Sequence, residues 1–149
     1  MKIIDISLEI KEGMIIYPGN PETRVKAVRR VPFYSSSISE ITVGSHTGTH
    51  VDTPLHINNR GIGLEGISLE DLIGPCQVVD LTHCKNEIKA GDLKEIELLK
   101  KIILLKTANS LKGYEEFNPR FVHLSEDAAE YLTDIGIRTL GIDYLSVQR

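Results

Sequence analysis

The second half of the chain alternates short apolar runs with amphipathic stretches. Residues 102–105 form a continuous apolar run, which is typical of a strand covered on both faces. We predict further strands over residues 77–81 and 138–143. Between the strands we predict a helix from Asp92 through Lys101, capped by Asp92, and a second helix capped by Ser125 and ended by Gly136. This β-α-β-α-β order favours parallel strands joined by right-handed crossovers.

The first half of the chain reads as strands and turns. Mixed apolar and polar alternation predicts strands over residues 3–10 and 23–31, separated by a turn at residues 18–21. A third strand is expected from about Ser37 to Asp52, leaving the sheet near Pro54. We therefore predict an α/β fold in a single domain over residues 1–149, with a strand-rich N-terminal half and a β-α-β-α-β C-terminal half.

A cluster of histidines lies on the predicted third strand. His46, His50 and His56 are three of the five histidines in the chain, and Asp52 lies among them, all on even positions. Side chains alternate faces along a strand, so His46, His50 and Asp52 would project to one side. Imidazole nitrogen and carboxylate oxygen are ligands for Zn²⁺, Mn²⁺ and Fe²⁺. We predict a divalent-metal site, in preference to a polar strand face with ordinary surface histidines.

The local composition favours a strand over a helix in this segment. A helix would also bring His46 and His50 together, because residues i and i+4 share a helix face. The intervening residues are unsuited to a helix, since three threonines and a valine are β-branched and Gly48 and Pro54 weaken or break helices. His56 then follows Pro54 in a loop, where a proton-transfer group would be wanted.

The histidine motif resembles the His-x-Gly-Thr-His-x-Asp-x-Pro-x-His signature of the metal-dependent cyclase-like hydrolases. That family includes bacterial kynurenine formamidases and isatin hydrolases. The resemblance extends along the whole chain through six further landmarks in the family's order: residues 5–7, 17–19, 74–76, 80–81, 104–107 and 141–146. It implies a swivelling β/β/α-type domain.

The resemblance also implies roles for individual residues. His46, His50 and Asp52 match the metal ligands, with Zn²⁺ expected first and Mn²⁺ second. His56 matches the histidine that donates and accepts the proton. Tyr17, which precedes Pro-Gly, matches the aromatic residue that lines the substrate pocket of kynurenine formamidases. The implied reaction is hydrolysis of an amide or formamide bond by metal-activated water, in an arylformamidase (N-formylkynurenine) or a cyclic amidase.

One feature departs from the family pattern. Family members carry a further His and a Glu downstream that complete a two-metal site, whereas this sequence ends at Arg149, shortly after Asp143. We therefore expect a mononuclear or empty site, impaired hydrolysis and self-association into a homo-oligomer through the sheet edge near Asp143. His123 is the first candidate for a replacement ligand.

Two other functions stay open at this stage. The His50-Val-Asp52 segment is half of the facial triad of mononuclear Fe(II) oxygenases, although their other His commonly comes from far downstream. The early stop at Arg149 suggests a non-catalytic metal-binding remnant as the second alternative. Oxygen consumption and turnover of a formamide would separate these from the hydrolase.

Composition gives no support for a nucleic-acid-binding protein or a membrane protein. The net charge of −4 gives no basic footprint for nucleic acid, and no apolar run approaches the ~20 residues that span a membrane. The expected partner is a small-molecule substrate. Cys76 and Cys84 are too few for a disulfide framework, which indicates a reducing compartment, the cytoplasm. His83 and Cys84 are adjacent and isolated in the sequence, so a separate zinc site there has little support.

A glycine pattern at residues 61–66 matches the dinucleotide fingerprint G-x-G-x-x-G. That fingerprint binds a pyrophosphate when it follows a strand directly and opens a helix. Here it follows a loop, and the next helix is expected nearer Ser68. We interpret the glycines as a flexible loop rather than a nucleotide site.

Overall fold

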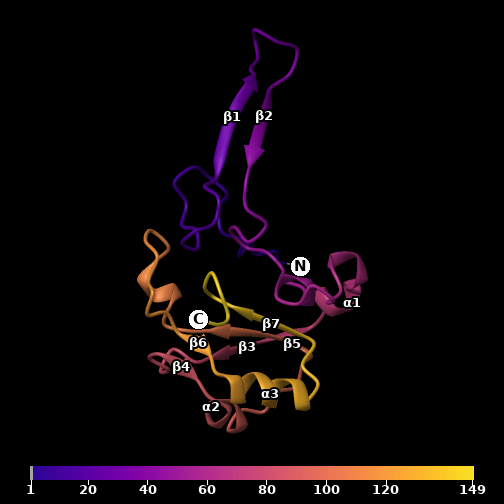
Figure 1. Ribbon diagram of the computed structural model, residues 1–149, viewed down its shortest axis with the longest axis vertical. Coiled ribbons are helices and arrows are strands. Elements are labelled where there is room, and N and C mark those ends of the chain that lie inside the picture. The colour runs from indigo at the N-terminus through magenta and orange to yellow at the C-terminus, as the bar shows by residue number, and fades with distance from the viewer. Residues whose placement is uncertain (1) are drawn as a thin grey trace. The chain divides into compact units, whose positions relative to one another are not determined.

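The computed structural model describes residues 2–149. These residues form two compact units. Figure 1 shows the ribbon coloured by residue number, with the helices and strands labelled. The first unit runs to Asp52 and includes residues 114–117, and the second comprises residues 53–113 and 118–149. Antiparallel and parallel sheets occur together with helices. The predicted α/β class is confirmed, and the extent of a single domain over residues 1–149 stays a prediction.

The first unit is built around an antiparallel hairpin of β1 (Arg24–Arg29) and β2 (Ile38–Thr42). A register shift between Ala27 and Arg29 bends the ladder, as a bulge does. Every residue of both strands is exposed. The strand predicted over residues 23–31 is confirmed. The strand predicted over residues 3–10 is wrong, because that segment makes no sheet ladder.

The second unit contains the parallel sheet. Its strands β3 (Cys76–Asp80), β5 (Ile102–Lys106) and β7 (Thr139–Ile142) lie in the order β3-β5-β7. The central strand β5 carries Ile103 and Leu105, which are almost completely buried, as the apolar run predicts. Ladder partners such as Val78 and Leu104 fix the register. The predicted parallel arrangement is confirmed.

The long helix α3 (Glu126–Asp134) begins and ends where the sequence predicts. The Ser125 hydroxyl accepts a hydrogen bond from the backbone N–H of Ala128 at 3.3 Å, which satisfies a donor of the first turn. Gly136 follows with φ of 74°, a left-handed conformation that favours glycine. Leu132 and Ala128 are buried in the core cluster beside the sheet.

Helix α2 (Ala90–Lys94) is shorter than the sequence predicts. It begins before Asp92, whose carboxylate accepts the backbone N–H of Lys89 at 2.8 Å, so Asp92 lies within the first turn. Beyond the helix, the side-chain amide of Gln77 in β3 forms hydrogen bonds with the backbone of the segment that follows α2. It donates to the carbonyl of Glu97 and accepts from the N–H of Leu99, both at 2.9 Å. The prediction of a helix through Lys101 is therefore wrong.

Short elements complete the second unit. They are the 3-10 helices Pro54–His56, Leu64–Gly66 and Ser110–Lys112, the helix α1 (Leu69–Leu72), and the paired strands β4 (Glu87–Ile88) and β6 (His123–Leu124). The glycines of the G-x-G-x-x-G pattern lie in a loop and a 3-10 helix, as the sequence interpretation requires. Among residues 2–149, no helix has the length and apolar character needed to cross a bilayer.

A long loop between β5 and β6 is closed at its base by one buried side chain. The Asn109 amide donates to the carbonyl of Val122, and its oxygen accepts the N–H of Val122, both at 2.8 Å. This pairing imitates the two hydrogen bonds of a backbone ladder. It holds the two ends of the loop together without a strand.

Candidate metal centre

The histidine motif lies in a loop and not on a strand. Strand β2 ends at Thr42, and residues 43–52 contain no strand, with turns and bends over residues 45–49. The prediction of a strand to Asp52 is therefore wrong. Gly48 explains the departure, because its φ of 66° is a left-handed conformation that breaks an extended ladder. The loop turns back on itself at this glycine and thereby brings His46 and His50 together.

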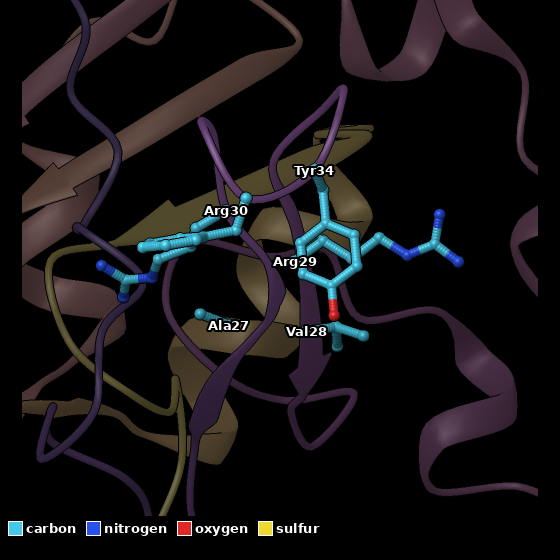
Figure 2. A pocket seen from close by; sticks show the side chains of 6 residues that line it. Ala27, Val28, Arg29, Arg30 and Tyr34 are labelled. Atoms are coloured by element: carbon cyan, nitrogen blue, oxygen red, sulfur yellow. The ribbon is translucent and has the colours of Figure 1, made fainter.

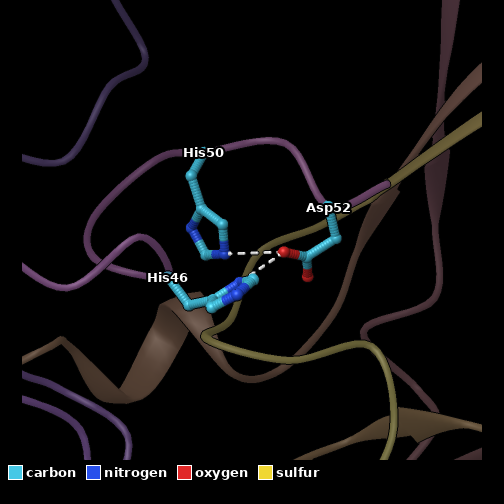
Figure 3. Close-up of side chains that lie close together, drawn as sticks. All are labelled: His46, His50 and Asp52. Carbon is cyan, nitrogen blue, oxygen red and sulfur yellow. Dashed lines mark hydrogen bonds and ion pairs between the residues drawn. The ribbon is translucent and has the colours of Figure 1, made fainter. Parts of the chain in front are cut away.

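Three side chains of the motif converge in this loop, as Figure 3 shows. One ligand atom from each of His46, His50 and Asp52 lies within 4.8 Å of the others. The Nδ1 atom of His46 is 2.5 Å from Asp52 Oδ1, and the Nε2 atom of His50 is 3.4 Å from the same oxygen. The convergence that the spacing predicts is present, although the backbone reaches it by a different route.

A backbone contact sets the orientation of the His50 ring. Its Nδ1 atom lies 2.9 Å from the carbonyl oxygen of Gly48. Because a carbonyl oxygen only accepts, Nδ1 carries the hydrogen in this contact, and the lone pair is left on Nε2, the atom that faces Asp52. Metal-ligating histidines are usually held by such a second hydrogen bond. The sequence signal for this role is Gly48 itself, which the spacing argument did not use.

The donor set fits a divalent metal. Two imidazoles and a carboxylate suit Zn²⁺, Mn²⁺ or Fe²⁺. Zn–N and Zn–O bonds of about 2.0–2.2 Å in a tetrahedral arrangement separate their ligand atoms by about 3.4 Å. This matches the 3.4 Å between His50 and Asp52, whereas the 2.5 Å between His46 Nδ1 and Asp52 Oδ1 is a direct hydrogen bond that must open to admit an ion. The side chains are 29%, 19% and 44% exposed for His46, His50 and Asp52, so the cluster is partly screened and still accessible.

The loop is supported from within the first unit. A Cβ atom added to Gly48 would lie 2.5 Å from the Cδ1 atom of Ile10, so this side chain packs directly on the glycine. The Thr49 hydroxyl accepts the backbone N–H of Leu8 at 2.8 Å. The segment before residue 11 thus serves as a support for the histidine loop, although it is not the strand that its alternation predicts.

Gly48→Ala is expected to destabilise this loop and to weaken metal binding. A side chain at this position combines a left-handed backbone with the close contact to Ile10, which costs about 1–3 kcal/mol. Chemical unfolding and Mn²⁺ titration measure the two effects. Gly91→Ala is the matched control, because Gly91 has no positive φ and a Cβ there meets nothing within 4 Å. Equal stability and metal affinity of the two variants would contradict the role given to Gly48.

His56 lies in the 3-10 helix Pro54–His56, which belongs to the second unit. Its backbone N–H donates to the carbonyl of Thr53 at 2.9 Å, and the residue is exposed. Pro54 occupies the first turn of that helix, where its missing N–H is of no consequence. The proton-transfer role of His56 stays a prediction.

Tyr17 is partly buried in the first unit. Its ring meets that of Phe117 edge to face, with the ring centroids 5.1 Å apart. Phe117 belongs to the part of the long loop that clusters with the first unit. The substrate-binding role of Tyr17 stays a prediction, and Phe117 of the long loop is its aromatic neighbour.

The other polar residues considered from the sequence are engaged elsewhere. His123, in β6, has its Nε2 atom 3.8 Å from the Glu87 carboxylate of β4. Lys106 donates to Asp80 at 2.8 Å, and this hydrogen bond, with help from Thr82, holds the pKa of Asp80 well below its usual range. Lys106 and Asp80 thus pair with each other at the carboxyl ends of β5 and β3.

Comparison with known proteins places these observations in a family. The family model described as putative cyclase matches residues 4–149. Kynurenine formamidase of Bacillus cereus is 31% identical over 97% of this chain and 69% of its own length. The Salinibacter ruber enzyme of the same name is 27% identical over 99% of this chain and 71% of its own length.

Two solved structures resemble the fold closely. One, described as a potential metal-dependent hydrolase with cyclase activity, has a TM-score of 0.84 at 38% identity and covers 99% of this chain and 70% of its own. A predicted metal-dependent hydrolase from Bacillus stearothermophilus has a TM-score of 0.82 at 36% identity, with coverage of 99% and 71%. The fold and the site thus define an enzyme of the hydrolase type. The chain belongs to the putative cyclase family.

Proposed function

We propose that this protein is a metal-dependent hydrolase that cleaves an amide or formamide bond. The observation that carries the proposal is the convergence of His46, His50 and Asp52 within 4.8 Å. Relatives named kynurenine formamidase favour an arylformamide such as N-formylkynurenine as substrate, with a cyclic amide as the second choice. In the reaction, the C–N bond breaks, water forms the new C–O bond, and a proton passes to the leaving amine.

His46, His50 and Asp52 are proposed to hold one divalent ion, Zn²⁺ first and Mn²⁺ second. When bound, such an ion supplies Lewis acidity toward a carbonyl group and toward water. The Gly48 carbonyl keeps the Nε2 lone pair of His50 turned toward Asp52, which prepares this pair as ligands. The partial exposure of the cluster leaves access for a small molecule.

His56 is proposed as the proton-transfer residue. It follows Asp52 by four positions in the chain, and histidine is the residue that most often transfers protons in catalysis. An imidazole of this kind accepts the proton of the attacking water and returns it to the leaving nitrogen. Tyr17, with Phe117 edge-on to its ring, is proposed to contact the aryl part of the substrate.

A mononuclear Fe(II) oxygenase is the second candidate. Two histidines and one carboxylate are the ligand set of such enzymes, and the cluster contains those residue types. Fe²⁺ loading with measurement of oxygen consumption tests this candidate. A hydrolase consumes no oxygen and releases formate from a formamide.

The hydrolase proposal is tested by turnover of the full chain. Protein loaded in turn with Zn²⁺ and Mn²⁺ is expected to release formate and the aryl amine in equal amounts from N-formylkynurenine. Removal of the ion with a chelator should abolish release, and reloading should restore it. Full loading of the histidine cluster with neither formate release from N-formylkynurenine nor hydrolysis of a cyclic amide would overturn the assignment and leave a non-catalytic metal-binding protein.

We further propose that the protein forms a homo-oligomer. Self-association through the sheet edge near Asp143 stays a prediction, and we propose the β1–β2 hairpin as a second surface for the contact. An isolated two-stranded hairpin is marginally stable in water, and this one exposes large apolar side chains. These are Val25, Val28, Phe33, Ile38 and Ile41. Near the turn, six residues including Arg29 and Tyr34 line an open pocket, and the Arg29 guanidinium lies 5.7 Å from the Tyr34 ring centroid (Figure 2).

Light scattering across a range of protein concentrations tests the oligomer. We expect a mass above that of one chain, and Ile41→Glu should lower it, because a buried unpaired charge opposes association. Leu99→Glu is the matched control, since Leu99 is equally exposed in the second unit. A single-chain mass at every concentration would contradict the proposal.

Two further expectations concern location and partners. Cys76 and Cys84 are both free thiols, which favours a reducing compartment, and we propose the cytoplasm. A small-molecule substrate is the proposed partner. The net charge of −4 gives no reason to expect nucleic acid.

A further inference from the structure

A second group of metal-ligating side chains lies in the second unit, separate in sequence from the histidine loop. It consists of His83, Cys84 and Asp92. We propose that these three residues bind a zinc-type divalent ion through one thiolate, one imidazole and one carboxylate. This site goes beyond the proposed hydrolase function and does not rest on it.

The geometry of the group suits a tetrahedral ion. One ligand atom from each residue lies within 4.8 Å of the others. The sulfur of Cys84 is 3.6 Å from the Nε2 atom of His83. Zn–S bonds of about 2.3 Å and Zn–N bonds of about 2.0–2.1 Å at the tetrahedral angle place those two atoms about 3.6 Å apart. The observed separation therefore needs little adjustment to accept the ion.

Local structure brings these residues together from two elements. His83 and Cys84 lie in the turn after β3, where the N–H of Cys84 donates to the carbonyl of Leu81 at 3.0 Å. Asp92 lies in the first turn of α2, and the N–H of Lys89 fixes one of its carboxylate oxygens at 2.8 Å. An ion held here would tie the end of a sheet strand to the start of a helix.

The surroundings distinguish the group from an ordinary core cysteine. Cys84 is 6% exposed and packs in the core cluster, whereas His83 is exposed and offers a route from solvent. Core packing accounts for Cys84, and the helix start accounts for Asp92. Neither accounts for the imidazole nitrogen that points at the sulfur.

The donor chemistry selects the ion. Thiolate and imidazole together favour Zn²⁺, Co²⁺ or Cd²⁺ over Mg²⁺, Ca²⁺ and Mn²⁺. Binding forms a metal–sulfur bond and releases the thiol proton to solvent. The three protein ligands leave one tetrahedral position open. The histidine loop contains no sulfur, so only the second site can give thiolate-to-metal charge-transfer absorption.

Titration of the full chain with Co²⁺ tests the proposal. We expect thiolate-to-cobalt charge-transfer absorption in the near ultraviolet, which saturates by two equivalents per chain in the wild-type protein, where the histidine cluster also takes Co²⁺, and at one equivalent in His50→Ala. The absorption should be lost in Cys84→Ser. It should persist in Cys76→Ser, which removes the exposed cysteine of β3, and in His50→Ala, which disables the other cluster. Zn²⁺ should displace the Co²⁺ and abolish the absorption.

Several outcomes would overturn the second site. These are no charge-transfer absorption in the wild-type protein at saturating Co²⁺, absorption that survives Cys84→Ser, or absorption that disappears in Cys76→Ser. If circular dichroism shows that Cys84→Ser does not fold, His83→Gln replaces it, because that side chain is exposed. His83→Gln should weaken Co²⁺ binding at least about tenfold, and unchanged affinity would refute the proposal.

Discussion

His50→Ala is expected to abolish stoichiometric metal binding at the histidine cluster. The variant removes the nitrogen that lies 3.4 Å from Asp52 Oδ1 and also the hydrogen bond to the Gly48 carbonyl that aims it. Loss of a partner that only orients a ligand already costs about 10–100-fold in affinity, so loss of the ligand itself should cost more. The His50 side chain is 19% exposed and lies in a loop, so the parallel sheet of the second unit should stay folded.

Mn²⁺ is the preferred probe for this experiment. It suits nitrogen and oxygen ligands and has little affinity for a site that contains a thiol, so it reports on the histidine cluster alone. Bound Mn²⁺ is measured on protein purified without chelator, and circular dichroism checks the fold. Unchanged Mn²⁺ content in a folded His50→Ala protein would refute the ligand assignment.

His56→Ala is expected to affect the hydrolysis rate and not metal binding. It should retain the metal and lose about 10²–10⁴-fold in the rate of formamide hydrolysis, the usual contribution of a positioned acid or base. The side chain lies in an exposed 3-10 helix, so its removal leaves no core cavity. Steady-state rates of formate release and metal content on the same sample provide the two measurements.

The two variants control each other. If His56→Ala also loses the ion, His56 is a ligand and not a proton-transfer group. If it hydrolyses at the wild-type rate, the proton-transfer role is wrong. His56→Gln separates the two functions further, because glutamine keeps a polar side chain of similar length without an imidazole that titrates.

The elements that the sequence predicts best are those decided by local patterns. The apolar run of β5 predicts a central buried strand, and Ile103 and Leu105 are almost completely buried there. Helix α3 carries its own start and stop signals in Ser125 and Gly136. Both signals act within a few residues, so no knowledge of distant contacts is needed.

Two wrong predictions, the strand over residues 3–10 and the helix through Lys101, have a different cause, since distant partners decide the outcome. The third, the strand to Asp52, fails locally at Gly48. Residues 3–10 alternate as a strand does, but a strand needs a neighbouring edge to pair with, and alternation does not supply one. The predicted helix through Lys101 is interrupted where Gln77, some twenty residues earlier, takes the backbone groups of Glu97 and Leu99. Hydrogen bonds from a distant side chain, such as those of Gln77, produce no periodic pattern in the sequence.

The three side chains of the candidate metal centre meet as predicted, but by a different backbone route, and their role as metal ligands stays a prediction. Even spacing suggested a strand that turns His46, His50 and Asp52 to one face. The structure instead folds the chain back at Gly48, and the same three side chains meet. The spacing was therefore informative about chemistry, because several backbone routes bring close neighbours in sequence together. Asp92 joins His83 and Cys84 only through the fold, which no spacing argument reveals.

The two hydrogen bonds between Asn109 and Val122 hold the ends of the long loop together. Changes in the length of the loop and changes at its base therefore have different consequences. Lengthening a loop whose ends are already held costs little, because closure entropy grows only with the logarithm of its length. Residues between the paired positions can therefore vary without loosening the sheet. Phe117 lies within that interval, beside Tyr17. Under the proposed role of Tyr17, substrate range would depend on residues inside this loop, whereas Asn109 at its base would contribute to stability.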